Sequence, residues 1–201
     1  MKKILMLGTG GTIASVPSED GLVPALDGKT MVALVPELKG LCHIDYKQLL
    51  NLDSSNIAPT HWKIIAKALA ENYDAYDGFV ITHGTDTMAY SAAALSQMVS
   101  GCKKPVIFTG AQLPIGAEGT DAKDNVLHAF LVATSETQGV CRAFGKFVIN
   151  GLCAKKCAAK TSTASTASIK YLWQPSPTIT SLGTLMLALA LKVKLSPLIL
   201  S

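Results

Sequence analysis

The sequence predicts an α/β fold in which a mostly parallel sheet lies between two helical layers, a three-layer α/β/α arrangement. Three short apolar runs support this prediction: Lys3–Gly8, Gly78–Thr82 and Pro105–Thr109. Their apolar residues are continuous rather than alternating, which is typical of parallel strands buried on both faces. Helix-like stretches separate the runs, as parallel strand connections require. We expect one such domain over residues 1–160 and a separate tail over residues 161–201.

The elements between these strands are predicted from their apolar spacing. Pro59 suits the first turn of a helix, and apolar residues then recur on one face of that helix. An alanine-rich stretch after residue 87 predicts a helix that ends at about Ser100. Residues 121–135 carry apolar side chains at helical spacing, and Val140–Ile149 is expected to form one more strand.

Charge is distributed unevenly along the chain. Residues 1–150 contain all 14 acidic residues and 12 of the 18 basic residues, so they carry a net charge of −2. Residues 151–201 contain six lysines and no acid, and carry +6. The total of +4 is too small to indicate a nucleic-acid partner. Residues 161–168 are a Ser/Thr/Ala tract followed by an apolar run, and we assign this tail no role.

Cysteine usage and the apolar segments favour a cytoplasmic protein. Five cysteines, an odd number, are spread along the chain, unlike a disulfide framework. Cys153 and Cys157 lack the additional Cys or His ligands of a zinc site. The run Ile4–Leu7 is shorter than a signal-peptide core, and Ile179–Leu191 is shorter than a membrane span. We therefore expect no metal site and no membrane contact.

Polar residues follow the predicted strands at one edge of the sheet, where ligands bind in such folds. The first cluster, Gly8–Ile13, lacks the third glycine of a dinucleotide-binding motif. In the second, Thr85 and Asp86 precede a helix whose N-terminal amides favour an anionic group, and we expect Asp86 or Thr85 to cap that helix as well. His83 is interpreted as structural rather than as a base.

A threonine hydroxyl is a poor nucleophile that needs a neighbouring base or a polarising charge. Asp86 beside a lysine could position that lysine to accept the proton. The lysines that follow the last predicted strand, Lys155, Lys156 and Lys160, are the candidates, and spacing does not choose among them.

Two long motifs, Thr9–Ala14 and Val80–Met88, resemble those of the bacterial L-asparaginase family. Further resemblance occurs at Leu52–Ser55 and Phe108–Gln112. It covers roughly residues 1–160 and is closest in character to the cytosolic type I branch. The resemblance implies hydrolysis of L-asparagine to L-aspartate and ammonia without a cofactor, with some activity on L-glutamine.

The same resemblance implies a role for each matching residue. Thr12 would be the nucleophile on a mobile loop, and Thr85, Asp86 and a lysine would form a second cluster. Lys156 matches the family lysine best, and Lys155 is one step away. In substrate binding, Ser54 would hold the α-carboxylate, Asp86 the α-amino group and the Ala111 carbonyl the side-chain amide, with Asp53 supporting the pocket.

Two departures from the family pattern affect what we expect. Leu22 stands where many members have a tyrosine that helps to activate the first threonine. The family also has a second α/β domain that completes a neighbouring subunit's site in a dimer of dimers, and the tail does not resemble it. We therefore expect weak or no activity from this chain alone, and a homo-oligomer only where that domain is present.

Three alternatives stay open. The first is the asparaginase-like subunit of a tRNA-dependent amidotransferase, although such subunits usually carry extra sequence before the first motif, which begins here at residue 9. The second is a non-catalytic amino-acid-binding domain that uses Ser54 and Asp86 without turnover. The third is a defective fragment whose apolar tail drives aggregation.

Overall fold

A six-stranded sheet forms the centre of the molecule. The structure, a computed structural model, describes residues 1–18, 21–24 and 26–153. The strand order is β4-β1-β5-β6-β7-β8, and every neighbouring pair is parallel except β7 and β8. The strands are β1 (Lys3–Gly10), β4 (His43–Leu52), β5 (Gly78–Thr82), β6 (Pro105–Thr109), β7 (Gly139–Phe144) and β8 (Phe147–Asn150). The predicted mostly parallel sheet is thus confirmed.

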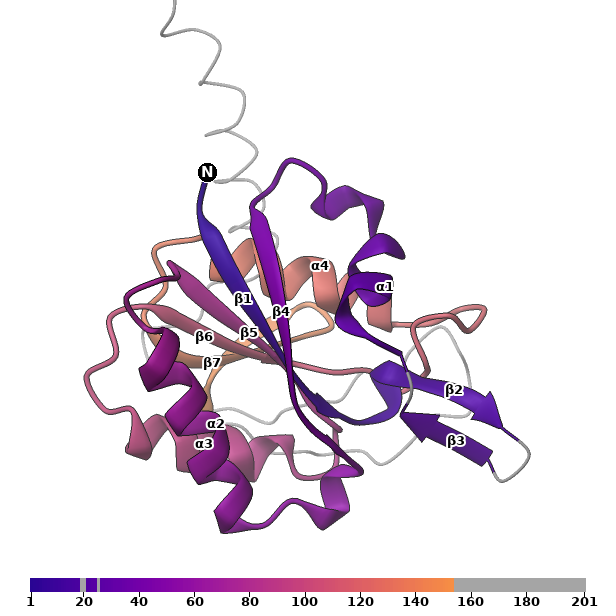
Figure 1. Ribbon diagram of the computed structural model, residues 1–201, viewed down its shortest axis with the longest axis horizontal. Helices are drawn as coiled ribbons and strands as arrows, with labels where there is room; N and C mark the ends of the chain where they lie inside the picture. Colours follow the sequence, from indigo (N-terminus) through magenta and orange to yellow (C-terminus); the bar gives the residue numbers. More distant parts are fainter. Residues whose placement is uncertain (19–20, 25, 154–201) are drawn as a thin grey trace, which may run out of the picture.

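Helices cover both faces of this sheet (Figure 1). Helices α2 (Pro59–Asn72) and α3 (Met88–Met98) pack on one face, and α1 (Gly28–Ala33) and α4 (Ala122–Ala133) on the other. Successive residues of β1 contribute to opposite layers, since Ile4 and Met6 pack with α1 and α4 while Leu5 packs with α2 and α3. The strand is apolar throughout because both of its faces are covered, and the three-layer prediction is confirmed.

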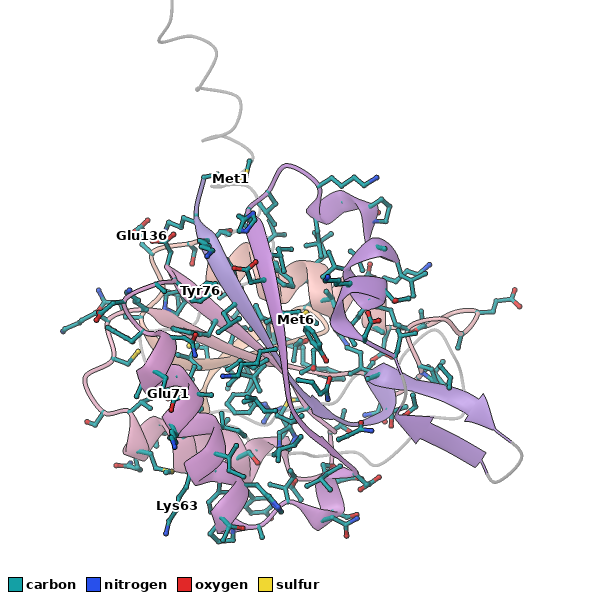
Figure 2. The ribbon with its side chains drawn as sticks, viewed as in Figure 1. Met1, Met6, Lys63, Glu71, Tyr76 and Glu136 are labelled. Carbon is teal, nitrogen blue, oxygen red and sulfur yellow. The ribbon has the colours of Figure 1, made fainter. Side chains whose placement is uncertain are left out.

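Figure 2 contrasts the interior with the surface. Met6 lies inside the molecule on β1 and is 0% exposed, whereas Lys63 projects from the outer side of α2. Burying a side chain of this size contributes about 1.5–3 kcal/mol to folding. The two apolar layers therefore supply much of the stability that holds the connecting loops in place.

The prediction of one strand over Val140–Ile149 is wrong, because the segment forms the antiparallel hairpin β7–β8. Phe144 pairs with Phe147 across a two-residue turn, and Gly145 begins that turn with φ of 56°. Glycine adopts positive φ at little cost, and Gly-X is a common hairpin turn. The turn signal lies inside an otherwise apolar run, which is why the segment resembles a single strand.

Several elements were not predicted. Strand β4 lies at the edge of the sheet, and its residues are half-buried or exposed, so it lacks the continuous apolar pattern of β5 and β6. The hairpin of β2 (Ser15–Ser18) and β3 (Gly21–Pro24) projects from the body of the molecule after β1 (Figure 1).

The tail lies outside the described residues, together with Lys155, Lys156, Lys160 and Cys157. In the part that the structure does describe, no helix is long and apolar enough to cross a membrane.

Candidate active site

Four loops meet at the carboxyl end of the sheet, one after each of the neighbouring strands β4, β1, β5 and β6. Hydrogen bonds tie the β1 segment to the strands on either side. Gly11 N donates to the carbonyl of Leu52 at the end of β4 (3.1 Å). The buried Thr9 hydroxyl donates to the carbonyl of Thr82 at the end of β5 (2.8 Å). The loops are therefore fixed relative to one another at the edge where such sheets bind ligands.

Two glycines bring the two candidate threonines together. Gly11 has φ of 83°, and a Cβ atom on it would lie 2.5 Å from N and 2.6 Å from Cα of Gly84. The two backbones therefore touch where no side chain fits. Thr12 follows Gly11 and Thr85 follows Gly84, so both threonines extend from this contact, and both are half-buried.

The loop after β4 packs against the same contact. Ser54 is 2% exposed, and its hydroxyl oxygen lies 2.6 Å from the position that a Cβ atom of Gly84 would take. The Thr87 hydroxyl donates to the Ser54 carbonyl (2.6 Å). Asp53 accepts from the hydroxyl (2.5 Å) and the backbone N–H (2.8 Å) of Ser55, and these hydrogen bonds hold its pKa below the usual value. Asp53 is thus a carboxylate at neutral pH.

His83 is fully buried at the end of β5. Its backbone N–H donates to the Thr109 carbonyl (2.9 Å), and its Nδ1 lies 2.8 Å from the Gly84 carbonyl oxygen. Burial lowers the pKa of His83, the hydrogen bond to Gly84 opposes that shift, and the nearby Arg142 guanidinium adds to it. A neutral imidazole that donates from Nδ1 to Gly84 fits a structural role, because it anchors the loop that carries Thr85.

The loop after β6 reaches the site from the opposite side. Gln112 Nε2 donates to the Thr85 hydroxyl (3.4 Å). Ile115 N donates to the Ile13 carbonyl (3.3 Å), so this loop also holds the segment after β1. Ala111, at the start of the loop, is 1% exposed. Two threonine loops are thus held between the loops that follow β4 and β6.

The structure brings six of the predicted site residues to this edge: Thr12, Asp53, Ser54, Thr85, Asp86 and Ala111. Asp53 and Asp86 are exposed, and two carboxylates beside two hydroxyls suit a small ligand with a positive charge. Lys156 lies outside the described residues. Within residues 1–18, 21–24 and 26–153, no group of three or more His, Cys, Asp or Glu side chains could hold a metal ion.

The expected capping of the following helix by Thr85 or Asp86 is wrong. Helix α3 begins at Met88, and its N-cap residue is Thr87, which makes no side-chain cap. The Thr87 hydroxyl instead donates to Ser54, so a side chain of the kind that caps helices connects two loops of the site.

Comparison with known proteins establishes the family. Residues 3–173 match the family described as "Asparaginase, N-terminal". The chain belongs to the asparaginase family. The L-asparaginase of Thermococcus kodakarensis is 43% identical over 143 residues, which cover 71% of this chain and 44% of that protein.

Two other similar proteins extend the comparison. A glutamyl-tRNA(Gln) amidotransferase subunit from Methanococcus vannielii is 41% identical over 143 residues, covering 70% of this chain and 33% of that protein. The crystal structure of L-asparaginase I from Vibrio cholerae has a TM-score of 0.74 at 34% identity, covering 90% of this chain and 56% of that chain. The chain spans less than half the length of the curated relatives named here.

All four site loops lie inside the part of the chain that matches the asparaginase family. Two residues that shape these loops, Asp121 and Asn125, were not predicted from the sequence; both bond to the segment after β6. Their spacing of four residues at the start of a predicted helix was the available signal. An aspartate at that position resembles an ordinary N-cap, however, and its loop partners lie several residues away in sequence.

Proposed function

We propose that this chain forms the N-terminal catalytic part of an amidohydrolase that converts L-asparagine to L-aspartate and ammonia. The observation that carries the proposal is the backbone contact of Gly11 with Gly84, the residues that directly precede Thr12 and Thr85. Family membership supports it, since the match includes both threonine loops.

In this reaction Thr12 is the nucleophile. Its hydroxyl oxygen attacks the side-chain amide carbon, and its proton passes to a second cluster of Thr85, Asp86 and Lys156. The C–N bond then breaks, the nitrogen takes up a proton and leaves as ammonia, and an ester remains on Thr12. Water cleaves the ester, which releases L-aspartate and restores the hydroxyl. Side chains move every proton, so the proposed reaction uses no cofactor.

Substrate recognition uses the loops that surround the threonines. Ser54 binds the α-carboxylate, Asp86 the α-amino group and the Ala111 carbonyl the side-chain amide. Asp53 supports the pocket as a carboxylate whose pKa is held low by Ser55. L-Glutamine, one methylene longer, is a second and poorer substrate of the same pocket.

The proposal also covers the cellular compartment, the partners and the assembly of the protein. We place it in the reducing cytoplasm, because Cys42, Cys102, Cys141 and Cys153 are free thiols. The partners are small amino acids, not nucleic acid or a membrane, and the whole protein is a homo-oligomer. The 201 residues on their own should turn over weakly, since water exclusion and exact positioning supply much of a hydrolase's rate.

The test is ammonia release from L-asparagine by the purified chain. Thr12→Ala and Thr85→Ala should each abolish release, and retained turnover in either variant would contradict the assigned roles. Asparagine binding without any ammonia would instead favour a non-catalytic amino-acid-binding domain. Light scattering with and without residues 161–201 identifies aggregation driven by the tail.

A second candidate function follows from the similarity to a glutamyl-tRNA(Gln) amidotransferase subunit. In this role the chain would pass its ammonia to a tRNA-linked reaction rather than release it. Ammonia release that requires a second protein and charged tRNA would favour this candidate, whereas release from free L-asparagine alone favours the asparaginase.

A further inference from the structure

The segment after β6 is held by the carboxylate of Asp121. Gln112 N lies 3.0 and 3.1 Å from the two carboxylate oxygens, and Leu113 N donates to Oδ1 (3.2 Å). Asp121 is the N-cap residue of α4, yet its side chain makes no cap to that helix. At the start of α4 it is the Thr120 hydroxyl that accepts a hydrogen bond, from Ala122 N (3.0 Å). The Asp121 carboxylate is therefore directed at the loop instead of at its own helix.

Asn125, one turn along α4, also holds the Asp121 carboxylate and the segment after β6. It is 1% exposed, and its Nδ2 donates both to the Gly110 carbonyl (2.9 Å) and to Asp121 Oδ2 (3.0 Å). Its Oδ1 accepts from Gly145 N in the β7–β8 turn (2.8 Å). Because this buried amide uses both of its N–H donors and its oxygen in hydrogen bonds, it holds the Asp121 carboxylate in one orientation.

The hydrogen bonds from Gln112 N to Asp121 determine the direction of the preceding carbonyl, that of Ala111. Ala111 C=O and Gln112 N–H belong to the same planar trans peptide, in which the two bonds point in opposite directions. Asp121 draws the N–H toward the start of α4, so the Ala111 carbonyl faces away from α4. Among the described residues, no hydrogen bond to the Ala111 carbonyl oxygen is found.

We propose that Asp121 is a positioning residue that directs the Ala111 carbonyl and thereby makes the site select an amide over a carboxylate side chain. This inference rests on the proposed function, in which that carbonyl meets the side-chain amide. A carbonyl oxygen only accepts hydrogen bonds. The amide of L-asparagine can donate to it, whereas the side-chain carboxylate of L-aspartate has no proton to donate at neutral pH.

The test compares Asp121→Asn with Asp124→Asn in the full chain. Asp124 lies in the first turn of the same helix and is exposed, so the control makes the same chemical change nearby. At position 121, asparagine places an NH₂ group where two oxygens accepted. Amide hydrogen exchange measured by NMR should accelerate at least tenfold at Gln112 and Leu113 in Asp121→Asn, and stay unchanged in Asp124→Asn.

Ligand affinity supplies the second readout, in a Thr12→Ala background that prevents turnover. Asp121→Asn should raise the Kd for L-asparagine by about 5–10-fold, as loss of one hydrogen bond predicts, and the Kd for L-aspartate by less than about twofold. A purely structural role would weaken both ligands equally. If Asp121→Asn does not fold, Asp121→Ser carries the same measurements, because the hydrogen bond from Ala122 N to Thr120 at the start of α4 does not involve the side chain at 121.

The outcomes separate this proposal from the proposed function. Equal weakening of both ligands, unchanged exchange at Gln112, or the same effects in Asp124→Asn would each overturn the role of Asp121. If the Thr12→Ala chain binds neither ligand, the proposed function fails. The exchange measurement then still decides whether Asp121 holds the peptide.

Discussion

Replacing Gly11 with alanine should destabilise the protein far more than the same change at glycines whose Cβ position is open, such as Gly116 and Gly119. The new methyl group would lie 2.5 Å from the backbone nitrogen and 2.6 Å from the Cα of Gly84. Relaxed carbon contacts lie at about 3.5–4.0 Å, so the two loops would have to separate by roughly 1 Å. Neither neighbour is a flexible side chain that could swing away.

The expected magnitude has two sources. Gly11 has φ of 83° and ψ of 171°, a backbone conformation essentially restricted to glycine, and a residue with a Cβ atom there costs about 1–3 kcal/mol. Forcing atoms into a well-packed place costs a further 1–3 kcal/mol or so. The total of about 4 kcal/mol corresponds to a fall in Tm of about 8–16 °C for a protein of this size. Thermal and urea unfolding of the full chain measure both quantities.

Two matched glycines separate the contributions. Gly119 has φ of 67° with no atom near the Cβ position, so Gly119→Ala should show only the backbone cost of about 1 kcal/mol. Gly116 has open space without that conformation, and Gly116→Ala should be neutral or slightly stabilising. If Gly11→Ala costs no more than Gly119→Ala, the loops do not pack as described, and the argument that places Thr12 beside Thr85 fails with them.

Three further predictions concern charge and exposure. Because burial lowers the pKa of His83 below 6.5, the unfolded chain binds a proton that the folded chain does not. As the pH is lowered from about 6.5, the free energy of unfolding should therefore decrease, by up to ~1.4 kcal/mol per pH unit. His83→Gln should flatten this dependence between pH 7 and 5, and parallel curves for the two proteins would contradict the assignment. Burial raises the pKa of Cys42 and Cys141 to about 11. In the folded chain at pH 8, iodoacetamide should therefore modify the exposed Cys153 long before either of them, as mapped by mass spectrometry. Early labelling of Cys42 or Cys141 would disprove this. Asp53 is the N-cap residue of the short helix Ser54–Asn56. Asp53→Ala removes its two hydrogen bonds from Ser55 and should cost about 1 kcal/mol in urea unfolding, more than the exposed control Asp74→Ala; equal losses would count against this capping role.

The sequence predicted best those elements whose pattern has one physical cause. Strands β5 and β6 were predicted at their observed limits, because five consecutive buried residues bounded by polar or turn residues have few other interpretations. Edge strand β4 was missed because half-exposed residues leave no such pattern. The β7–β8 hairpin was missed because a single glycine turn was outweighed by the apolar residues around it.

The site shows the same limit at the level of residues. The motifs identify Thr12 and Thr85, since each lies in a long and distinctive stretch of sequence. The contact between Gly11 and Gly84 depends on the register of β1 against β5, where Gly8 pairs with Thr82. Register is a property of the folded sheet, so spacing along the chain does not reveal it.

The pairing of β1 with β5 also bears on how the chain is made. Ile4 pairs with Ile44 on one side and with Gly78 on the other, so both neighbours of β1 come from far along the chain and β5 is made after β4. Contacts this remote in sequence form slowly, and unpaired apolar strands invite association between chains. Variants that weaken this pairing should therefore reduce the yield of folded protein at 37 °C more than the activity of each molecule that folds.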